Sequence, residues 1–317
     1  MTNNSGQKDH TTLSPDEAYS MLGNETRIQI LRTLGEIETP LSFSELRERV
    51  GIRQGAQFNY HLNKLVGHFI EKKEEGYILR QPGRRVIQAI LSGAVTEDPK
   101  IEPTQVNFPC DHCGSNVIVS YSRGKMQLSC EHCGGNFSRL DTPSAENGDE
   151  NMAKGNLASM PLPPTGVENR SPLEIFRAAA TLEHLNAIAA TSNVCPYCAG
   201  HVTYEISDVC EDHDASVGLC DNCQHKNAVR IRFVCKNCIF EETYPMVMAL
   251  LTVPELTVFV SEHGLNMTSK GVEWGWIYGE EIIATEPFKA KFTFTIDDDS
   301  ISITIDENLD VIETTRH

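Results

Sequence analysis

Six short pairs of metal-ligand residues constrain this chain of 317 residues more than any other feature. Five pairs have the form Cys-x2-Cys and one has the form Cys-x2-His, and together they contain all 11 cysteines of the chain. Each pair can form a tight loop that presents two ligands to one tetrahedral ion, so that two pairs complete a four-ligand site. The six pairs therefore predict three closed structural zinc sites.

The first two pairs enclose a predicted hairpin. Strand-like segments at 116–121 and 125–129 lie between them, with a turn at Ser122-Arg123-Gly124. A hairpin brings the two pairs together, which is typical of a zinc ribbon. The sequence predicts such a ribbon over 106–140; a rubredoxin-like iron site or a redox-active dithiol are the alternatives. The predicted ligands are Cys110, Cys113, Cys130 and Cys133.

The other four pairs predict a two-zinc module over 193–243. If the segments between them run down, up and down, alternate pairs meet at the same end. The predicted cross-braced sites are Cys195, Cys198, Cys220 and Cys223, and then Cys210, His213, Cys235 and Cys238. Pairing in sequential order along the chain is the alternative. Because complete sets of four leave no open position for a reacting water, we expect structural sites and no enzyme.

Charge is distributed unevenly along the chain, whose formal net charge is -17. Residues 1–99 contain 12 Lys+Arg and 13 Asp+Glu, a net charge of -1, and the remainder carries -16. Binding to nucleic-acid phosphates needs clustered positive charge, so we expect it only in the first third. No apolar run approaches the roughly 20 residues that cross a bilayer, and no signal peptide is apparent. A cytoplasmic protein without a membrane partner is expected.

The first third has the pattern of a winged helix-turn-helix. Helices are predicted at 15–22, 25–36, 43–50, 54–66 and 81–92, and a short hairpin at 69–73 and 76–80. Capping boxes begin at Ser14 and Ser42, and Asn24 is a further N-cap. Two helices, a turn, a polar-faced helix and a two-stranded wing make up this DNA-binding fold. We therefore predict a DNA-binding domain over 14–95.

The helix at 54–66 has one apolar side, formed by Phe58, Leu62 and Leu65, and one polar side. Gln and Asn can bind adenine edges in the major groove, and Lys and Arg can bind phosphates. The alternative is a solvated face used for dimerisation or protein contact, and His61 is expected to be a half-buried structural residue. The candidate DNA-binding residues are Gln54, Gln57, Asn59, Tyr60, Asn63, Lys64, Lys72, Lys73, Arg80, Arg84 and Arg85.

The remaining segments complete a multidomain α+β protein. Residues 1–13 are predicted to be a disordered tail, 141–170 a flexible linker and 171–192 a connecting helix that begins with a capping box at Ser171. The region 244–317 is predicted to serve sensing or dimerisation. It has a helix at 253–263, with a capping box at Thr252, and antiparallel strands at about 281–285, 288–296, 300–305 and 309–314. Trp274 and Trp276 are expected in its core.

Two stretches carry a family resemblance. The segments LGNETRIQILRTLGE and LSFSELRERVGIRQGAQFNYHLNKLVGHFIEKKEEGYILRQPGRRVIQAIL resemble the ArsR-like winged-helix domain of haloarchaeal transcriptional regulators. The segments VCPYCAG, VCEDHD, CDNC and CKNCIF, with the C-terminal PFKAKFTFTIDDDSISITIDENLDVIETTR, are similar to the C-terminal region of the same proteins. No cysteine precedes Cys110, so arsenic-type sensing by the winged helix is not implied. The acid excess suits a salt-rich cytoplasm.

These observations lead us to expect a DNA-binding transcriptional regulator that acts by binding rather than by chemistry. Its winged helix would read duplex DNA as a homodimer, while the zinc modules mediate assembly or contacts with a partner. The alternative is a zinc-ribbon scaffold of the transcription or RNA machinery that does not bind DNA sequence-specifically. A third interpretation is a metal or redox sensor.

Overall fold

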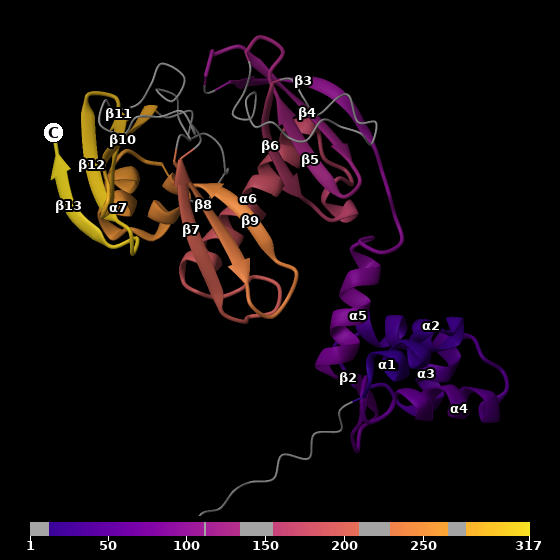
Figure 1. The fold of residues 1–317 in the computed structure, drawn as a ribbon. Coiled ribbons are helices and arrows are strands. Elements are labelled where there is room, and N and C mark those ends of the chain that lie inside the picture. Colours follow the sequence, from indigo (N-terminus) through magenta and orange to yellow (C-terminus); the bar gives the residue numbers. More distant parts are fainter. Residues whose placement is uncertain (1–12, 111, 134–154, 209–228, 266–276) are drawn as a thin grey trace, which may run out of the picture. The chain divides into compact units, whose positions relative to one another are not determined.

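The computed structural model describes residues 13–110, 112–133, 155–208, 229–265 and 277–317 (Figure 1). Contacts divide the chain into an N-terminal unit, Met1–Glu97, and a C-terminal unit, Asp98–His317. Both combine helices with small antiparallel sheets, so the chain is a multidomain α+β protein. The segments 106–140, 171–192, 193–243 and 244–317 were predicted as separate parts, whereas contacts join them into one unit.

The N-terminal unit contains five helices and a hairpin among its described residues. The helices agree with the predicted ranges to within one residue: α1 Pro15–Leu22, α2 Glu25–Gly35, α3 Phe43–Val50, α4 Gly55–Leu65 and α5 Gln81–Leu91. Both predicted capping boxes are present, at Ser14 and Ser42, and the Asn24 side chain accepts a hydrogen bond from the Arg27 N–H. These local caps explain why the helix starts could be predicted.

The hairpin of the N-terminal unit consists of β1, Ile70–Lys72, and β2, Tyr77–Leu79. Tyr77 also exchanges two backbone hydrogen bonds with Leu41, which adds a bridge to the hairpin from the segment before α3. Gly76 permits this approach, because its φ is 147° and a Cβ atom there would overlap the Leu41 carbonyl. The core beneath is formed by buried side chains that include Ile30, Leu31, Leu46, Phe58, Leu62, Leu65 and Ile70.

The C-terminal unit begins with a four-stranded antiparallel sheet in the order β3-β4-β5-β6. Its strands are β3 Ile101–Pro109, β4 Asn116–Ser122, β5 Lys125–Ser129 and β6 Asn156–Pro161. β6 and the short 3-10 helix η2, Pro164–Gly166, lie within the predicted linker. The linker prediction is therefore wrong for 155–170, where Leu157 and Leu162 join the core. Residues 141–154 lie outside the described residues.

A long helix and a three-stranded sheet follow. The helix α6, Pro172–Thr191, begins at the predicted capping box of Ser171 and contacts all four strands of the first sheet. The second sheet is antiparallel, in the order β7-β8-β9, with β7 Val202–Asp208, β8 Val229–Cys235 and β9 Glu241–Pro245. α6 also contacts the 3-10 helix η3, Met246–Thr252, which follows the second sheet. The same helix therefore packs against the first sheet and against the segment that follows the second.

The chain ends in a helix and a four-stranded antiparallel meander. α7 spans Pro254–Glu262, and the strands are β10 Ile277–Thr285, β11 Phe288–Ile296, β12 Asp299–Asp306 and β13 Val311–Arg316. The capping box predicted at Thr252 is wrong: Val253 is the N-cap, without a side-chain hydrogen bond, because 246–252 form η3. Phe292, Phe294, Ile303 and other inward side chains pack with α7 and η3. Trp274 and Trp276 lie outside the described residues.

No helix among the described residues is long and apolar enough to span a lipid bilayer.

Candidate metal centres and nucleic-acid interface

The first cysteine group forms at one end of the β3–β6 sheet. Cys110, Cys113, Cys130 and Cys133 place their sulfur atoms within 4.8 Å of one another. The Sγ atoms of Cys110 and Cys133 are 3.6 Å apart, and those of Cys113 and Cys130 are 3.5 Å apart. A tetrahedral zinc with bonds of about 2.3 Å separates its sulfurs by about 3.8 Å. The group can hold a metal ion, as the sequence predicted.

The surroundings of this group favour the thiolate form of its exposed cysteine, Cys113. The backbone N–H of Ser115 lowers the pKa of Cys113 to about 6, whereas burial raises the pKa of Cys110 to about 12. The N–H of His132 also donates to the Cys130 sulfur, at 3.4 Å. Backbone N–H groups that donate to sulfur stabilise negative charge on it, and a metal cation bound by all four sulfurs would neutralise the remaining thiolate charge.

The second cysteine group joins the first and last pairs of its region. Cys195, Cys198, Cys235 and Cys238 place their sulfurs within 4.8 Å of one another. Cys198 Sγ lies 3.5 Å from Cys235 Sγ. Backbone N–H groups of Gly200 and Asn237 donate to Cys198 and Cys235 at 3.4 and 3.3 Å, and that of Asn237 lowers the pKa of Cys235 to about 7. This group can also hold a metal ion.

The pairing of the second group corrects the prediction. The predicted cross-braced pairing, of Cys195 and Cys198 with Cys220 and Cys223 and of Cys235 and Cys238 with Cys210 and His213, is wrong. Pairing in sequential order is also wrong, because Cys195 and Cys198 meet Cys235 and Cys238. The reason is the register of one hairpin, in which Val202 of β7 lies opposite Cys235 of β8. The first and fourth pairs therefore meet at one end. The predicted ligands Cys210, His213, Cys220 and Cys223 lie outside the described residues, between Asp208 and Val229.

Both centres are built from the same backbone loop. The N–H of the first cysteine donates to the carbonyl of the residue five positions later in three loops: Cys110 to Ser115, Cys195 to Gly200 and Cys235 to Phe240, at 2.7 to 2.9 Å. Each centre then connects to an antiparallel sheet, with two paired strands between its loops and a further strand after the second loop. The C-terminal unit thus contains two versions of one metal-binding design.

The fourth loop closes differently, and sequence reasoning missed the residue responsible. The N–H of Cys130 donates to the carbonyl of Gly155, at 2.8 Å, across a much longer stretch of chain. Gly155 has a φ of 83°, and a Cβ atom there would overlap the Cys130 carbonyl oxygen. Only glycine fits such a position without strain. No local signal marks it, because the contact is long-range.

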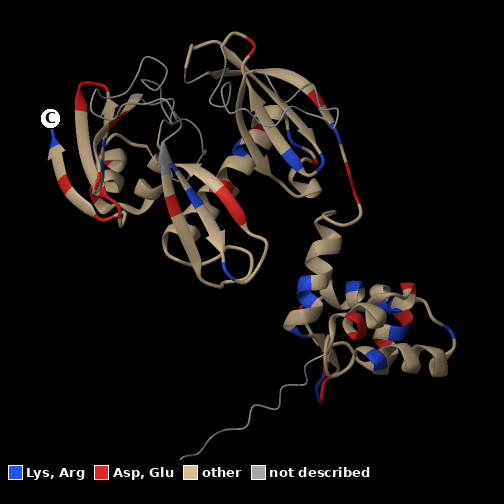
Figure 2. Cartoon of the chain, viewed as in Figure 1, with Lys and Arg blue, Asp and Glu red and all other residues tan. Residues whose placement is uncertain are grey.

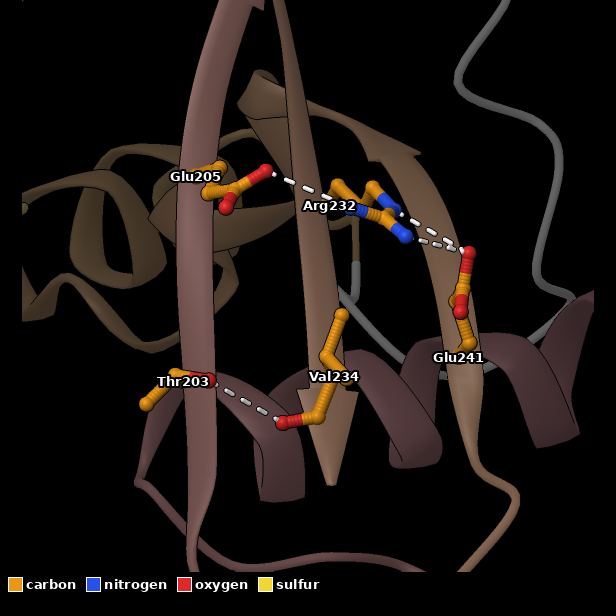
Figure 3. A network of polar contacts seen from close by, with 5 residues as sticks. All are labelled: Thr203, Glu205, Arg232, Val234 and Glu241. Atoms are coloured by element: carbon orange, nitrogen blue, oxygen red, sulfur yellow. Dashed lines mark hydrogen bonds and ion pairs between the residues drawn. The ribbon is translucent and has the colours of Figure 1, made fainter. Parts of the chain in front are cut away.

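The sheet of the second centre is clamped on its exposed face (Figure 3). Arg232 on the central strand β8 reaches Glu205 on β7 at 3.3 Å and Glu241 on β9 at 2.7 Å. On the opposite face, Ile231 and Phe233 are fully buried. Around Arg232, one face of the sheet therefore belongs to the core and the other meets solvent, and the ion pairs bridge all three strands.

The candidate nucleic-acid interface lies in the N-terminal unit. The structure places α4 with Phe58, Leu62 and Leu65 fully buried, while Tyr60 is 59% exposed. The Lys64 ammonium stands 5.9 Å from the centre of the Tyr60 ring, so the two share one exposed face. His61 is half-buried, as predicted. All eleven predicted DNA-contacting residues are exposed: Gln54, Gln57, Asn59, Tyr60, Asn63, Lys64, Lys72, Lys73, Arg80, Arg84 and Arg85.

Taken together, the described residues define a two-unit α+β protein with two tetracysteine groups that could hold metal ions. Residues 107–311 match the family model described as "Domain of unknown function (DUF7351)", and residues 15–90 match "Domain of unknown function (DUF7347)". Because the first match covers well over half of the chain, the chain belongs to that family. The two matches fall in different structural units. No curated protein and no solved structure matches the chain.

Proposed function

We propose that the protein is a DNA-binding transcriptional regulator and that its N-terminal unit is a winged helix-turn-helix that reads duplex DNA. The observation that carries the proposal is the division of α4 into two faces. Its apolar residues are fully buried, and its amide and lysine side chains are exposed on the other side. A helix with such a face, supported by two preceding helices and followed by a hairpin, suits insertion into a major groove.

Charge within the N-terminal unit supports the same surface. Residues 53–85, which contain α4, the hairpin and the start of α5, have seven Lys+Arg and three Asp+Glu. Residues 13–52 have four Lys+Arg and seven Asp+Glu. The two parts therefore carry net charges of +4 and -3, with the positive part on the elements proposed to meet DNA (Figure 2). Phosphate contacts need this kind of local excess rather than a basic protein overall.

Each element has a distinct role in the proposed complex. The amide side chains of α4, such as Asn59 and Asn63, would bind adenine edges, while Lys72 and Lys73 at the hairpin tip would bind phosphates. Gln54, the N-cap of α4, makes no side-chain cap hydrogen bond, which leaves the first N–H groups of the helix open to a phosphate. A homodimer would place two such helices in successive major grooves.

The metal centres have a structural role in this proposal. Four sulfurs around each centre form a closed shell, which zinc fills in structural sites, and no position remains for a reacting water. Zinc would therefore hold the C-terminal unit together, and this unit would serve dimerisation, sensing or contact with the transcription machinery. Cys210, His213, Cys220 and Cys223 would supply a third zinc site. The protein would accordingly not be an enzyme.

The decisive experiment is a genome-wide map of DNA occupied by the tagged full-length protein, followed by binding measurements on the occupied fragments at high salt. The double variant Asn59→Ala, Lys64→Ala should lose specific binding by at least about tenfold, since each good base contact is worth about 1–3 kcal/mol. Both side chains are exposed, so circular dichroism should show a retained fold. Arg32→Ala on α2, where Arg32 pairs with Glu36, is the matched control and should bind normally.

The competing function is a zinc-ribbon scaffold of the transcription or RNA machinery. It predicts that no genomic fragment is protected by the zinc-loaded protein and that the double variant behaves like the parent. That pair of results would refute the proposed regulator.

A further inference from the structure

The C-terminal unit contains a pocket of about 260 Å³, partly open to solvent, that no metal centre uses. Its walls come from the β3–β6 sheet, α6, the β9–η3 segment and β10. Apolar and aromatic side chains line most of it, including Phe108, Phe176, Ala180, Met248 and Tyr278. A cavity of about 150 Å³ is sufficient for benzene, so this one can hold a single ring with a small substituent.

One wall of the cavity carries a buried acid. Glu183 is 7% exposed and lies on α6, seven residues after Phe176 and three after Ala180 on the same apolar face of the helix. Burial raises the pKa of Glu183 to about 7, and repulsion from Glu242 acts in the same direction. A carboxyl group in this position is costly to the folded state when ionised. Side-chain hydrogen bonds from Tyr244 and Asn186 act against burial and lower this pKa. Glu183 is thus an ionisable group in an otherwise apolar wall, where a ligand that enters the cavity would meet it.

The charges around the cavity identify the sign of that ligand. Two acids, Glu183 and Glu242, line the cavity together with Arg230. The charge of Arg230 is offset by the nearby Glu280, whose carboxylate also accepts the Val229 N–H at 3.1 Å. Burial lowers the pKa of His184 to about 4, so this lining residue is neutral at pH 7. Lys125 acts on both acids but its side chain lies at an exposed position. When both acids are ionised, Glu183 and Glu242 outnumber Arg230 among the charged side chains that line the cavity.

We propose that this cavity binds a small lipophilic cation, a single-ring molecule with one ammonium group, and that Glu183 is its counter-ion. The aromatic walls suit such a ligand, since the faces of Phe176, Tyr244 and Tyr278 attract cations as well as apolar rings. On binding, the protonated fraction of Glu183 releases its proton to solvent, and the carboxylate pairs with the ammonium group. The site does not depend on whether the N-terminal unit binds DNA.

The test uses the zinc-loaded full chain and three probes of similar size. These are benzyltrimethylammonium, the neutral 3-phenylpropanol and the anionic 3-phenylpropionate, titrated calorimetrically at pH 7 in two buffers of different ionisation enthalpy. The cation should bind at least about tenfold more tightly than either other probe, with proton release, because pairing of its charge with one carboxylate in a partly enclosed site is worth about that factor. Glu183→Gln should remove this preference while leaving weak binding of the neutral probe.

Two further variants keep the test decisive. Glu313→Gln removes an exposed acid on β13 and should bind the cation like the parent. Ala180→Leu fills the cavity and should abolish binding of all three probes, while unchanged zinc content and circular dichroism show that the fold is retained. The proposal is overturned if the anion binds best, if the cation has no advantage over the neutral probe, or if Glu183→Gln binds the cation as well as the parent.

Discussion

The Sγ atoms of Cys195 and Cys238 lie 3.6 Å apart, although these residues belong to the first and the fourth ligand pairs of their region. Antiparallel pairing of β7 with β8 produces this contact, since Val202 stands opposite Cys235 and Asp208 opposite Val229. The chain leaves β7 at Asp208 and enters β8 at Val229, at the opposite end of the hairpin from this centre. The centre formed by the outer pairs has its four ligands without the two intervening pairs.

This pairing predicts the zinc content of cysteine variants. The double variant Cys195→Ser, Cys238→Ser should lose one zinc per chain, because both residues belong to one centre, whereas Cys113→Ser, Cys238→Ser should lose two. Zinc released by denaturation can be counted with a chromogenic chelator. A cross-braced arrangement would instead cost the first variant two zincs. Loss of a structural zinc should also destabilise the C-terminal unit strongly, since such sites bind with about 10–16 kcal/mol.

Gly155 should be intolerant of any side chain. Gly155→Ala introduces a Cβ atom that overlaps the Cys130 carbonyl oxygen at a φ of 83°, so the loop of the first metal centre must open or shift. We expect a loss of at least about 2 kcal/mol in the unfolding free energy of the C-terminal unit, measured by calorimetry of the zinc-loaded protein. Gly279→Ala is the control, because a Cβ there meets nothing within 4 Å. Equal stability of the two variants would contradict this account.

The capping box of α3 should contribute measurably to the N-terminal unit. The Ser42 hydroxyl accepts the Glu45 N–H at 3.3 Å, and the Glu45 carboxylate accepts the Ser42 N–H at 2.9 Å. Ser42→Ala should therefore lower the unfolding free energy of this unit by about 1 kcal/mol in a urea titration. Ser44→Ala, at an exposed position inside the same helix, should be neutral or slightly stabilising. If both variants behave alike, the cap does not stabilise this helix.

Glu183 should make the C-terminal unit less stable as pH rises. Its folded pKa of about 7 lies above the ordinary value of a glutamate, so the folded state holds a proton that the unfolded chain has released. The parent should lose stability relative to Glu183→Gln between about pH 4.5 and 7, by a difference on the order of 3 kcal/mol. Comparing the two proteins at each pH by thermal unfolding cancels the proton dependence of the metal centres. If the difference in stability between the two proteins does not change with pH, the Glu183 carboxyl group is solvated rather than buried.

The proposed phosphate contacts predict a specific salt dependence. Lys72→Ala, Lys73→Ala should weaken binding to specific and non-specific duplexes alike, and lower the slope of log affinity against log salt by about 0.9 for each lysine that binds a phosphate. Asn59→Ala should instead alter the preference among sequences and leave this slope unchanged. Fluorescence anisotropy on one occupied fragment and one scrambled duplex would measure both. An unchanged slope in the lysine variant would remove the hairpin from the interface.

Local patterns made the helices predictable. Ser14, Asn24 and Ser42 each supply a cap within four residues of the backbone groups they satisfy, so the helix starts could be located without knowledge of the rest of the chain. Alternation of apolar and polar residues likewise predicted β11 and β12. Thr252 shows the limit of this reasoning: its pattern matches a capping box, but packing of 246–252 as η3 moves the helix start by one residue.

Contacts between distant segments were decided by the tertiary structure. The cysteines that can act as ligands are predictable from their spacing, because a separation of two residues brings both sulfurs to one side of a loop. Which loops share an ion is not predictable in this way, since it depends on the register of β7 against β8. Three other features also depend on distant segments: the hydrogen bond from the Cys130 N–H to the Gly155 carbonyl, the pairing of β6 with β5, and the position of Glu183 in the wall of a cavity. Caps and spacings act over a few residues, whereas pairing and burial depend on partners that only the folded chain brings together.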